Sequence, residues 1–241
     1  MLANSPSLRS PEPIPPSLRS PEPISPSLRS PSSLATLLTL ADSRLPTGGH
    51  VHSGGIEEAI TAGRVTGVST LRAYLCRRIR SQGLVSASLA AAVHTGSLAV
   101  DAADTETDAR TPSPASRAAS RAQGRGLVRL AKRVWPEHDW QPVGIKPHLA
   151  VAAGAVGIAG GMAPEHTALS IVYTTMTGSA TAAQRLLALD PADVAALTFE
   201  LSALCEQTAA LAVTELADLS DPLLDVLAEA HAVRERPLFV S

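Results

Sequence analysis

The chain of 241 residues is long enough for one large domain or two small ones, and its 45% apolar residues suffice for a sizeable core. A formal net charge of −2 gives no reason to expect a nucleic-acid partner or attachment to a membrane by charge. Aromatic residues make up only 2% of the chain, so Leu, Val, Ile and Ala must build the core, which favours helices over strands.

Cysteine usage and hydropathy indicate a soluble, cytoplasmic protein. Only Cys76 and Cys205 are present, without a Cys-x-x-Cys motif, so neither a disulfide framework nor a cysteine zinc site is expected. The opening residues alternate proline, serine and arginine where a secretory signal would need an apolar run. The longest apolar stretch, residues 149–163, is shorter than the roughly 20 residues of a membrane span. We therefore predict no membrane attachment.

A ten-residue tandem repeat opens the chain. The sequence PSLRSP recurs from Pro6, Pro16 and Pro26. A short unit this rich in serine and proline cannot bury a core, and there are too few copies for a solenoid. We expect residues 1–32 to be disordered and residues 33–241 to form the folded domain.

The first predicted helices flank a glycine-rich loop. SLATLLTLAD, from Ser33, predicts a short helix before the loop, and GIEEAITAG, from Gly55, predicts a second helix closed by Gly63. Ser53 is expected to cap this second helix. Glu57 then lies in the first turn, where the helix dipole favours a negative charge.

A longer helical pattern follows. It begins at Ser69, the expected N-cap, places Leu71, Leu75 and Ile79 four residues apart, and continues past Gly83. The next segment, DAADTETDARTPSPAS, is acidic and interrupted by proline. We predict a loop there.

The rest of the sequence is also helical. One helix is predicted from Ala115 to Trp135, and the apolar segment PHLAVAAGAVGIAGGM forms another, whose glycine and alanine residues let neighbours pack at short distance. A further helix is expected after Pro164, with an irregularity at Gly178.

Two strong start signals mark the last helices. Asp190 precedes Pro191, and Ser220 or Asp221 precedes Pro222. Since period-two alternation is rare along the chain, we predict an all-α, single-domain bundle of roughly eight to ten helices.

The loop between the first two predicted helices contains residues that bear on three kinds of chemistry. His50 and His52 offer two metal ligands from one side of an extended segment, but no third ligand has suitable spacing, and Asp42 and Glu57 are the nearest carboxylates. A P-loop is excluded because the chain contains no Gly-Lys pair. A hydrolase nucleophile at Ser53 would require a Gly-x-Ser-x-Gly elbow, which is absent.

Arginine recurs every fourth residue in one predicted helix. The positions are Arg117, Arg121, Arg125, Arg129 and Arg133. At 3.6 residues per turn this spacing drifts only about 40° per step, which gives a slowly winding basic stripe. The stripe is either a solvated face or a surface that docks on acidic groups, including the chain's own Asp101, Asp104, Glu106 and Asp108. Without interleaved aromatic residues, nucleic-acid binding is its weakest use.

The stretch ADSRLPTGGHVHSGGIEEAI resembles the signature of the UreF family of urease accessory proteins. The residues that carry the resemblance are Asp42, Pro46, Gly48, His52, Ser53, Gly55 and Glu57. Similar blocks occur around Gly124, Gly154 and Gly178 and in the ending PLFVS, so the resemblance runs from Ser33 to the end. His50 departs from the family pattern, which is usually aromatic there, and Pro237 stands where an arginine is common.

The resemblance implies an all-helical, dimer-forming scaffold without a cofactor or enzymatic activity. It would assemble with the accessory protein UreD, also called UreH, and the GTPase UreG to deliver nickel into apo-urease. Arg236, Leu238 and Phe239 of the tail are expected to order against UreD. Arg117, Arg121 and Arg125 are further candidates for partner contacts.

Alternatives remain open at this point. The chain could be a nickel-binding metallochaperone that uses His50 and His52. It could also be an enzyme or its regulator, either a hydrolase at Ser53 or an activator of UreG that supplies an arginine such as Arg121.

Overall fold

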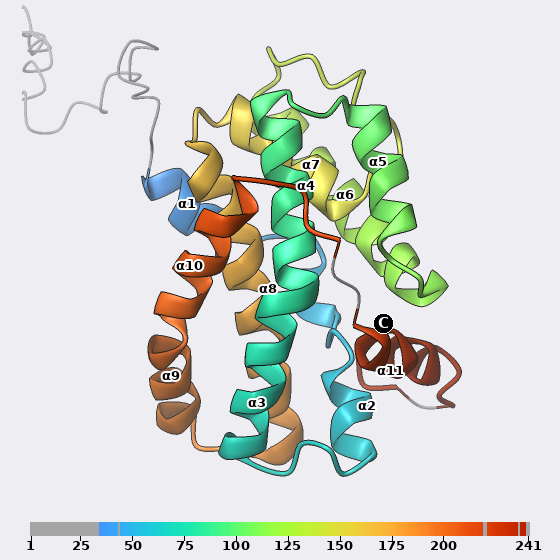
Figure 1. Ribbon diagram of the computed structural model, residues 1–241, viewed down its shortest axis with the longest axis vertical. Helices are drawn as coiled ribbons and strands as arrows, with labels where there is room; N and C mark the ends of the chain where they lie inside the picture. The colour runs from blue at the N-terminus through green and yellow to red at the C-terminus, as the bar shows by residue number, and fades with distance from the viewer. Residues whose placement is uncertain (1–33, 43, 219–220, 236, 240–241) are drawn as a thin grey trace, which may run out of the picture. The chain divides into compact units, whose positions relative to one another are not determined.

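The computed structural model describes residues 34–42, 44–218, 221–235 and 237–239 (Figure 1). The predicted Pro/Ser-rich segment 1–32 lies outside these residues. Pro31–Ser241 forms one compact unit. Within the described residues the chain is helical and contains no β-strand, which confirms the all-α prediction.

The first half of the domain contains short helices followed by one long helical run. The elements are α1 (Leu34–Leu40), a 3₁₀ turn (Gly49–Val51), α2 (Ile56–Thr61), α3 (Val68–Arg78), a π-helical turn (Ile79–Gly83) and α4 (Leu84–Thr95). The prediction that Ser69 caps α3 is wrong, because the helix begins at Val68. The Thr70 hydroxyl instead accepts hydrogen bonds from the backbone N–H groups of Thr66 and Gly67.

The second half contains the longer helices. The elements are α5 (Val100–Ala109), α6 (Pro114–Val134), α7 (Leu149–Ala159), α8 (Pro164–Leu187), α9 (Pro191–Glu200), α10 (Ser202–Ala212) and α11 (Pro222–Ala232). As predicted, the Asp190 carboxylate caps α9, and Asp221 caps α11. The expected irregularity at Gly178 is wrong, since α8 runs unbroken through it. The helix expected after Asp190 divides at Leu201 into α9 and α10.

The acidic segment predicted as a loop forms α5. Its buried side is small and apolar, since Ala103 packs with Val93 and Val151 in a satellite cluster of the core. Two of its acidic side chains, Asp104 and Asp108, are held by groups from α6 and from the residue before α7, as described below. The composition of the segment alone did not reveal these partners. The loop prediction is therefore wrong for residues 101–109 and holds only for residues 110–113, which connect α5 to α6.

The core forms where α4 packs against α7, α8 and α10. Large side chains such as Leu75, Leu89 and Met176 are fully buried there. A Cβ added at Gly154 of α7 would lie 2.6 Å from the Ala90 carbonyl oxygen of α4, closer than real Cβ contacts allow. This confirms that the small residues of α7 permit close helix packing.

Figure 1 shows two groups of helices that become important for function. Helices α5, α6 and α7 gather beside α4, and α7 packs against both α4 and α6. Helix α11 packs against α2 and α6 and leads into the C-terminal tail. None of the helices in the described part of the chain has both the length and the apolar composition required to cross a membrane.

Candidate functional site

The glycine-rich loop turns into α2 through two successive glycines. Gly54 and Gly55 have φ angles of +64° and +85°, in the left-handed region that favours glycine. The two glycines therefore let the loop turn tightly into the helix. The predicted Ser53 cap is wrong, because Gly55 precedes the helix and the buried Ser53 hydroxyl makes no hydrogen bond within the described structure. The Ser53 carbonyl instead accepts a hydrogen bond from the Ser179 hydroxyl at 3.1 Å.

Glu57 lies in the first turn of α2, as predicted, but its carboxylate binds the other end of the chain. The residue is only 3% exposed. Its Oε2 atom lies 2.7 Å from His231 Nε2 of α11. The backbone N–H groups of Leu238 and Phe239 donate to Oε1 and Oε2 at 2.9 and 3.0 Å. We call Glu57, His231 and these two amides the C-terminal clamp.

The hydrogen bonds of the clamp keep Glu57 ionised. Burial raises the pKa of this carboxyl, but the bonds from His231, Leu238 and Phe239 outweigh burial and leave the pKa below its usual value. Arg234 reinforces the same corner, because its Nη1 atom lies 3.2 Å from Glu58 Oε2. A buried negative charge therefore fixes the end of the tail.

The tail that the clamp holds presents one apolar side chain outward. Leu238 is 78% exposed, whereas Phe239 packs against the core. Arg236, the third tail residue expected to contact a partner, lies outside the described residues. The chain itself therefore orders residues 238 and 239 through their backbone, without a second protein.

A cavity of about 520 Å³ borders the glycine-rich loop. Asp42, His52 and Gly55 line it together with Arg78 at the end of α3 and Phe239 of the tail. The glycine-rich loop thus borders this cavity, whereas Glu57 faces the tail.

The two-histidine metal hypothesis gains no further ligand. The side chain of His50 lies outside the described structure, so the pair stays a prediction. Asp42, the nearest carboxylate before it, forms an ion pair with Arg44 at 2.6 Å. Glu57 is occupied by the clamp.

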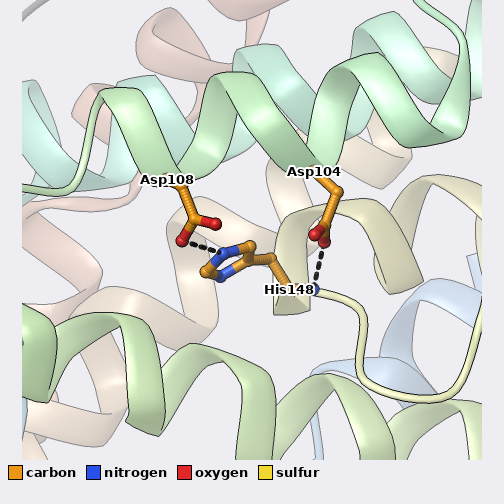
Figure 2. Close-up of side chains that lie close together, drawn as sticks. All are labelled: Asp104, Asp108 and His148. Atoms are coloured by element: carbon orange, nitrogen blue, oxygen red, sulfur yellow. Dashed lines mark hydrogen bonds and ion pairs between the residues drawn. The ribbon is translucent and has the colours of Figure 1, made fainter.

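A second buried histidine joins α5, α6 and α7 (Figure 2). His148 is fully buried, and its Nε2 atom lies 2.9 Å from Asp108 Oδ1. Its backbone N–H donates to Asp104 Oδ1 at 3.0 Å, and Nδ1 lies 3.0 Å from the Ser120 hydroxyl. Figure 2 shows both aspartates extending from one helix toward His148. We call Asp104, Asp108, Ser120, Arg121 and His148 the helix joint.

Arg121 supplies the positive charge of the helix joint. Its Nη1 atom lies 2.9 Å from Asp104 Oδ2, and Nη2 lies 2.7 Å from Asp108 Oδ2. One ligand atom from each of Asp104, Asp108 and His148 falls within 4.8 Å of the others, a spacing that suits a metal ion. Because Arg121 bridges both carboxylates and Arg117 Nε lies 3.7 Å from Asp108 Oδ1, two positive charges already face the two negative ones, and the arrangement fits a structural joint better than a metal site.

The protonation states of the helix joint follow from its partners. Burial lowers the pKa of His148, so the ring is neutral near pH 7. The Asp108 carboxylate only accepts, which places the ring proton on Nε2 and leaves Nδ1 to accept from Ser120. Burial raises the pKa of Asp108, but the bonds from His148 and Arg121 bring it below its usual value.

The basic stripe of α6 divides into two parts. Arg117 and Arg121 pair with the acidic groups of α5, which confirms for these two residues the predicted docking on the chain's own acidic segment. Arg125, Arg129 and Arg133 are exposed. Of the three arginines proposed for partner contacts, Arg125 is therefore the one that faces solvent.

Sequence reasoning missed the partners that complete both clusters. His231 lies 174 residues from Glu57, and His148 lies 40 residues from Asp108. No local spacing links such pairs. The sequence did contain a chemical indication, because an acidic side chain that is expected to be buried requires a hydrogen-bond or charge partner.

Comparisons with known proteins agree with one another. A family model described as UreF matches residues 65–202. The protein named "Urease accessory protein UreF" from Mycolicibacterium vanbaalenii is 76% identical over 212 residues, which cover 87% of this chain and 99% of that protein. Proteins of the same name from Mycobacterium marinum and Mycobacterium tuberculosis are 74% and 70% identical over 209 residues, with the same coverage.

Proposed function

Because the chain belongs to the UreF family of urease accessory proteins, we propose that it is a non-enzymatic scaffold for urease maturation in the cytoplasm. In this role the chain forms a homodimer that links UreD (UreH) and the GTPase UreG. The complex then inserts nickel into apo-urease in a GTP-dependent reaction. UreG would hydrolyse the nucleotide. The scaffold would shift UreG between its nickel-holding and nickel-releasing states by binding one of these two states more tightly than the other.

The C-terminal clamp is the observation that supports the scaffold role most directly. It fixes the backbone of the tail on a buried carboxylate and leaves the Leu238 side chain exposed. A docking segment held in place before binding loses less conformational entropy when the partner arrives. We propose that Leu238 inserts into an apolar pocket of UreD.

The alternative functions receive less support from the described residues. Direct nickel binding by His50 and His52 would need a third ligand, and both nearby carboxylates are engaged elsewhere. Activation of UreG through Arg121 would require this side chain to leave two ion pairs in the helix joint. Arg125 is the more accessible arginine for such a role.

Co-purification with UreD and UreG tests the proposal. The chain lacking its last eight residues and the Leu238→Asp variant should lose UreD and fail to activate apo-urease in the presence of UreG, GTP and nickel. A Val226→Asp variant, which changes an exposed apolar residue of α11 away from the tail, is the matched control and should bind normally. Full UreD binding by the truncated chain would reject the proposed role of the tail.

A further inference from the structure

Arg78 is a mostly buried arginine that ends α3, directly before the π-helical turn. Its Nη1 atom donates to the Gly54 carbonyl oxygen at 2.6 Å, and Nε donates to the Thr175 carbonyl oxygen at 3.4 Å. The guanidinium lies directly against Gly54, where an added Cβ would be 2.3 Å from Nη2. A glycine at position 54 is thus required for this placement.

Among the described residues, the positive charge of Arg78 has only neutral partners. The ion pairs of the described residues involve Arg44, Arg72, Arg77, Arg110, Arg117, Arg121 and Arg234. No described carboxylate lies within ion-pair distance of Arg78, which is bonded to backbone carbonyls, and Tyr74 donates to the same Gly54 oxygen. Burial lowers the pKa of Arg78 because desolvation disfavours its charge, but an arginine stays protonated in proteins. Charges withdrawn from water normally have a counter-charge.

Arg78 is also one of the residues that line the cavity of about 520 Å³ beside the glycine-rich loop. The other charged side chains of the lining are Asp42, Arg44 and Arg185, and Asp42 is already paired with Arg44. The amide of Gln82 and the hydroxyls of Thr174 and Thr177 add further polar groups to the wall. The cavity is therefore net positive, polar in part and larger than a small anion requires.

We propose that this cavity is a binding site for a small oxyanion of the carboxylate type, held by the guanidinium of Arg78. Nε and one hydrogen of Nη1 already donate to the Thr175 and Gly54 carbonyls, which leaves the second Nη1 hydrogen and those of Nη2. One N–H of Nη1 and one of Nη2 can bind a carboxylate side by side, which makes this ligand class the best match. The anion supplies the counter-charge that the described residues do not provide at this position. The inference depends on the surroundings of Arg78 and is independent of the proposed scaffold role. The carboxylate comes either from a free anion or from an acidic side chain of a partner protein.

Titration of the full-length chain with sodium acetate, against sodium chloride at equal ionic strength, tests for the free anion. The readouts are the melting temperature and the NMR resonance of the Arg78 Nε–H group. Acetate should shift both in a saturable manner. Arg78→Gln should weaken acetate binding by about tenfold or more, whereas Arg80→Gln, an exposed arginine two residues away, should leave it unchanged.

A second arm tests for a partner carboxylate. If acetate has no effect but the Arg78 Nε–H resonance shifts when UreD or UreG is added, the oxyanion belongs to that partner. If Arg78→Gln does not fold, Arg78→Lys replaces it, because lysine keeps the positive charge but lacks the planar guanidinium. Arg78→Lys should bind acetate, or the partner that carries the carboxylate, more weakly than the native chain does. A resonance that neither acetate nor either partner moves, or an Arg78→Gln chain that binds acetate like the native chain, would overturn the proposal.

Discussion

The C-terminal clamp and the helix joint use the same pair of groups, a buried histidine and a carboxylate, for different purposes. In the helix joint, Asp108 is 44% exposed and shares its charge with Arg121, so the cluster connects three helices. In the clamp, the Glu57 side chain is only 4% exposed, and two backbone amides of the tail donate hydrogen bonds to its negative charge. Both carboxylates also have an arginine nearby, Arg121 at 2.7 Å from Asp108 and Arg234 at 3.8 Å from Glu57, so the difference lies in the tail amides, which make the clamp fix a chain segment while the joint holds helices together.

Removing the histidine of the helix joint should have the largest effect on stability. His148→Ala leaves a cavity and deprives Asp108 and Ser120 of their partner, so we expect the free energy of unfolding to fall by about 2–4 kcal/mol. Urea unfolding followed by circular dichroism measures the change. His138→Ala, which removes only an edge contact with Trp140, should cost less than about 1 kcal/mol. Equal losses in the two variants would show that the joint has no special role.

The arginine of the helix joint should matter more than its neighbour in the basic stripe. Arg121→Gln breaks two ion pairs with α5, and we expect a loss of about 1–2 kcal/mol in the free energy of unfolding. Arg125→Gln changes an exposed residue and should leave the unfolding curve unchanged. If Arg125→Gln proved the more damaging, the division of the stripe into two parts would be wrong.

The clamp should affect the tail more than the whole fold. Glu57→Gln keeps the shape of the side chain but removes its charge, so we expect a loss of about 1 kcal/mol in global stability. Hydrogen exchange at the Leu238 and Phe239 amides should become at least about tenfold faster. Glu58→Gln, which alters the adjacent residue that pairs with Arg234, should leave these two amides protected.

Acidification should weaken the helix joint and the C-terminal clamp in different pH ranges. We expect the free energy of unfolding to fall more gradually here than in the three preceding predictions. The pKa of His148 is lowered from 6.5 in the folded chain, so its stability contribution is complete above pH 6.5 and is lost as the pH falls through the folded value. The pKa of Glu57 is lowered from 4.5, so its contribution is present above pH 4.5 and is lost only below it.

Unfolding measured between pH 8 and pH 3 separates the two stages. His148→Gln should reduce the loss below pH 6.5, and His94, whose pKa is also lowered by burial, should contribute to the loss that remains. Glu57→Gln should reduce the loss below pH 4.5 and leave the first stage intact. If the loss of stability below pH 6.5 were unchanged in His148→Gln, the group that titrates in this range would not be His148.

The sequence predicted those parts of the fold that depend on local rules. Helix starts at Asp190 and Asp221, the turn at Gly54 and Gly55, and the close packing of α7 at Gly154 all follow from residue types within one or two turns. The prediction failed where distant partners decide the outcome. The segment that forms α5 looked like a loop because the groups that hold it, Arg121 and His148, lie in other helices.

The candidate site was predictable in its position but not in its contacts. The family resemblance selected Glu57, yet local spacing explained it only as a residue of the first turn of α2. Its contacts with His231 and the tail depend on how α11 folds back against α2, which no local pattern encodes. Arg78 was missed for a similar reason, since its unusual feature is the lack of an acidic partner among the described residues.

The dissociation constant for UreD, measured for Glu57→Gln and His148→Ala under conditions where both variants are folded, tests the central claim most directly. If the clamp presents the tail and the joint only connects helices, Glu57→Gln should bind UreD at least about tenfold more weakly. His148→Ala should then bind within about twofold of the native chain. Native affinity in Glu57→Gln, combined with a loss of binding in His148→Ala, would contradict the account.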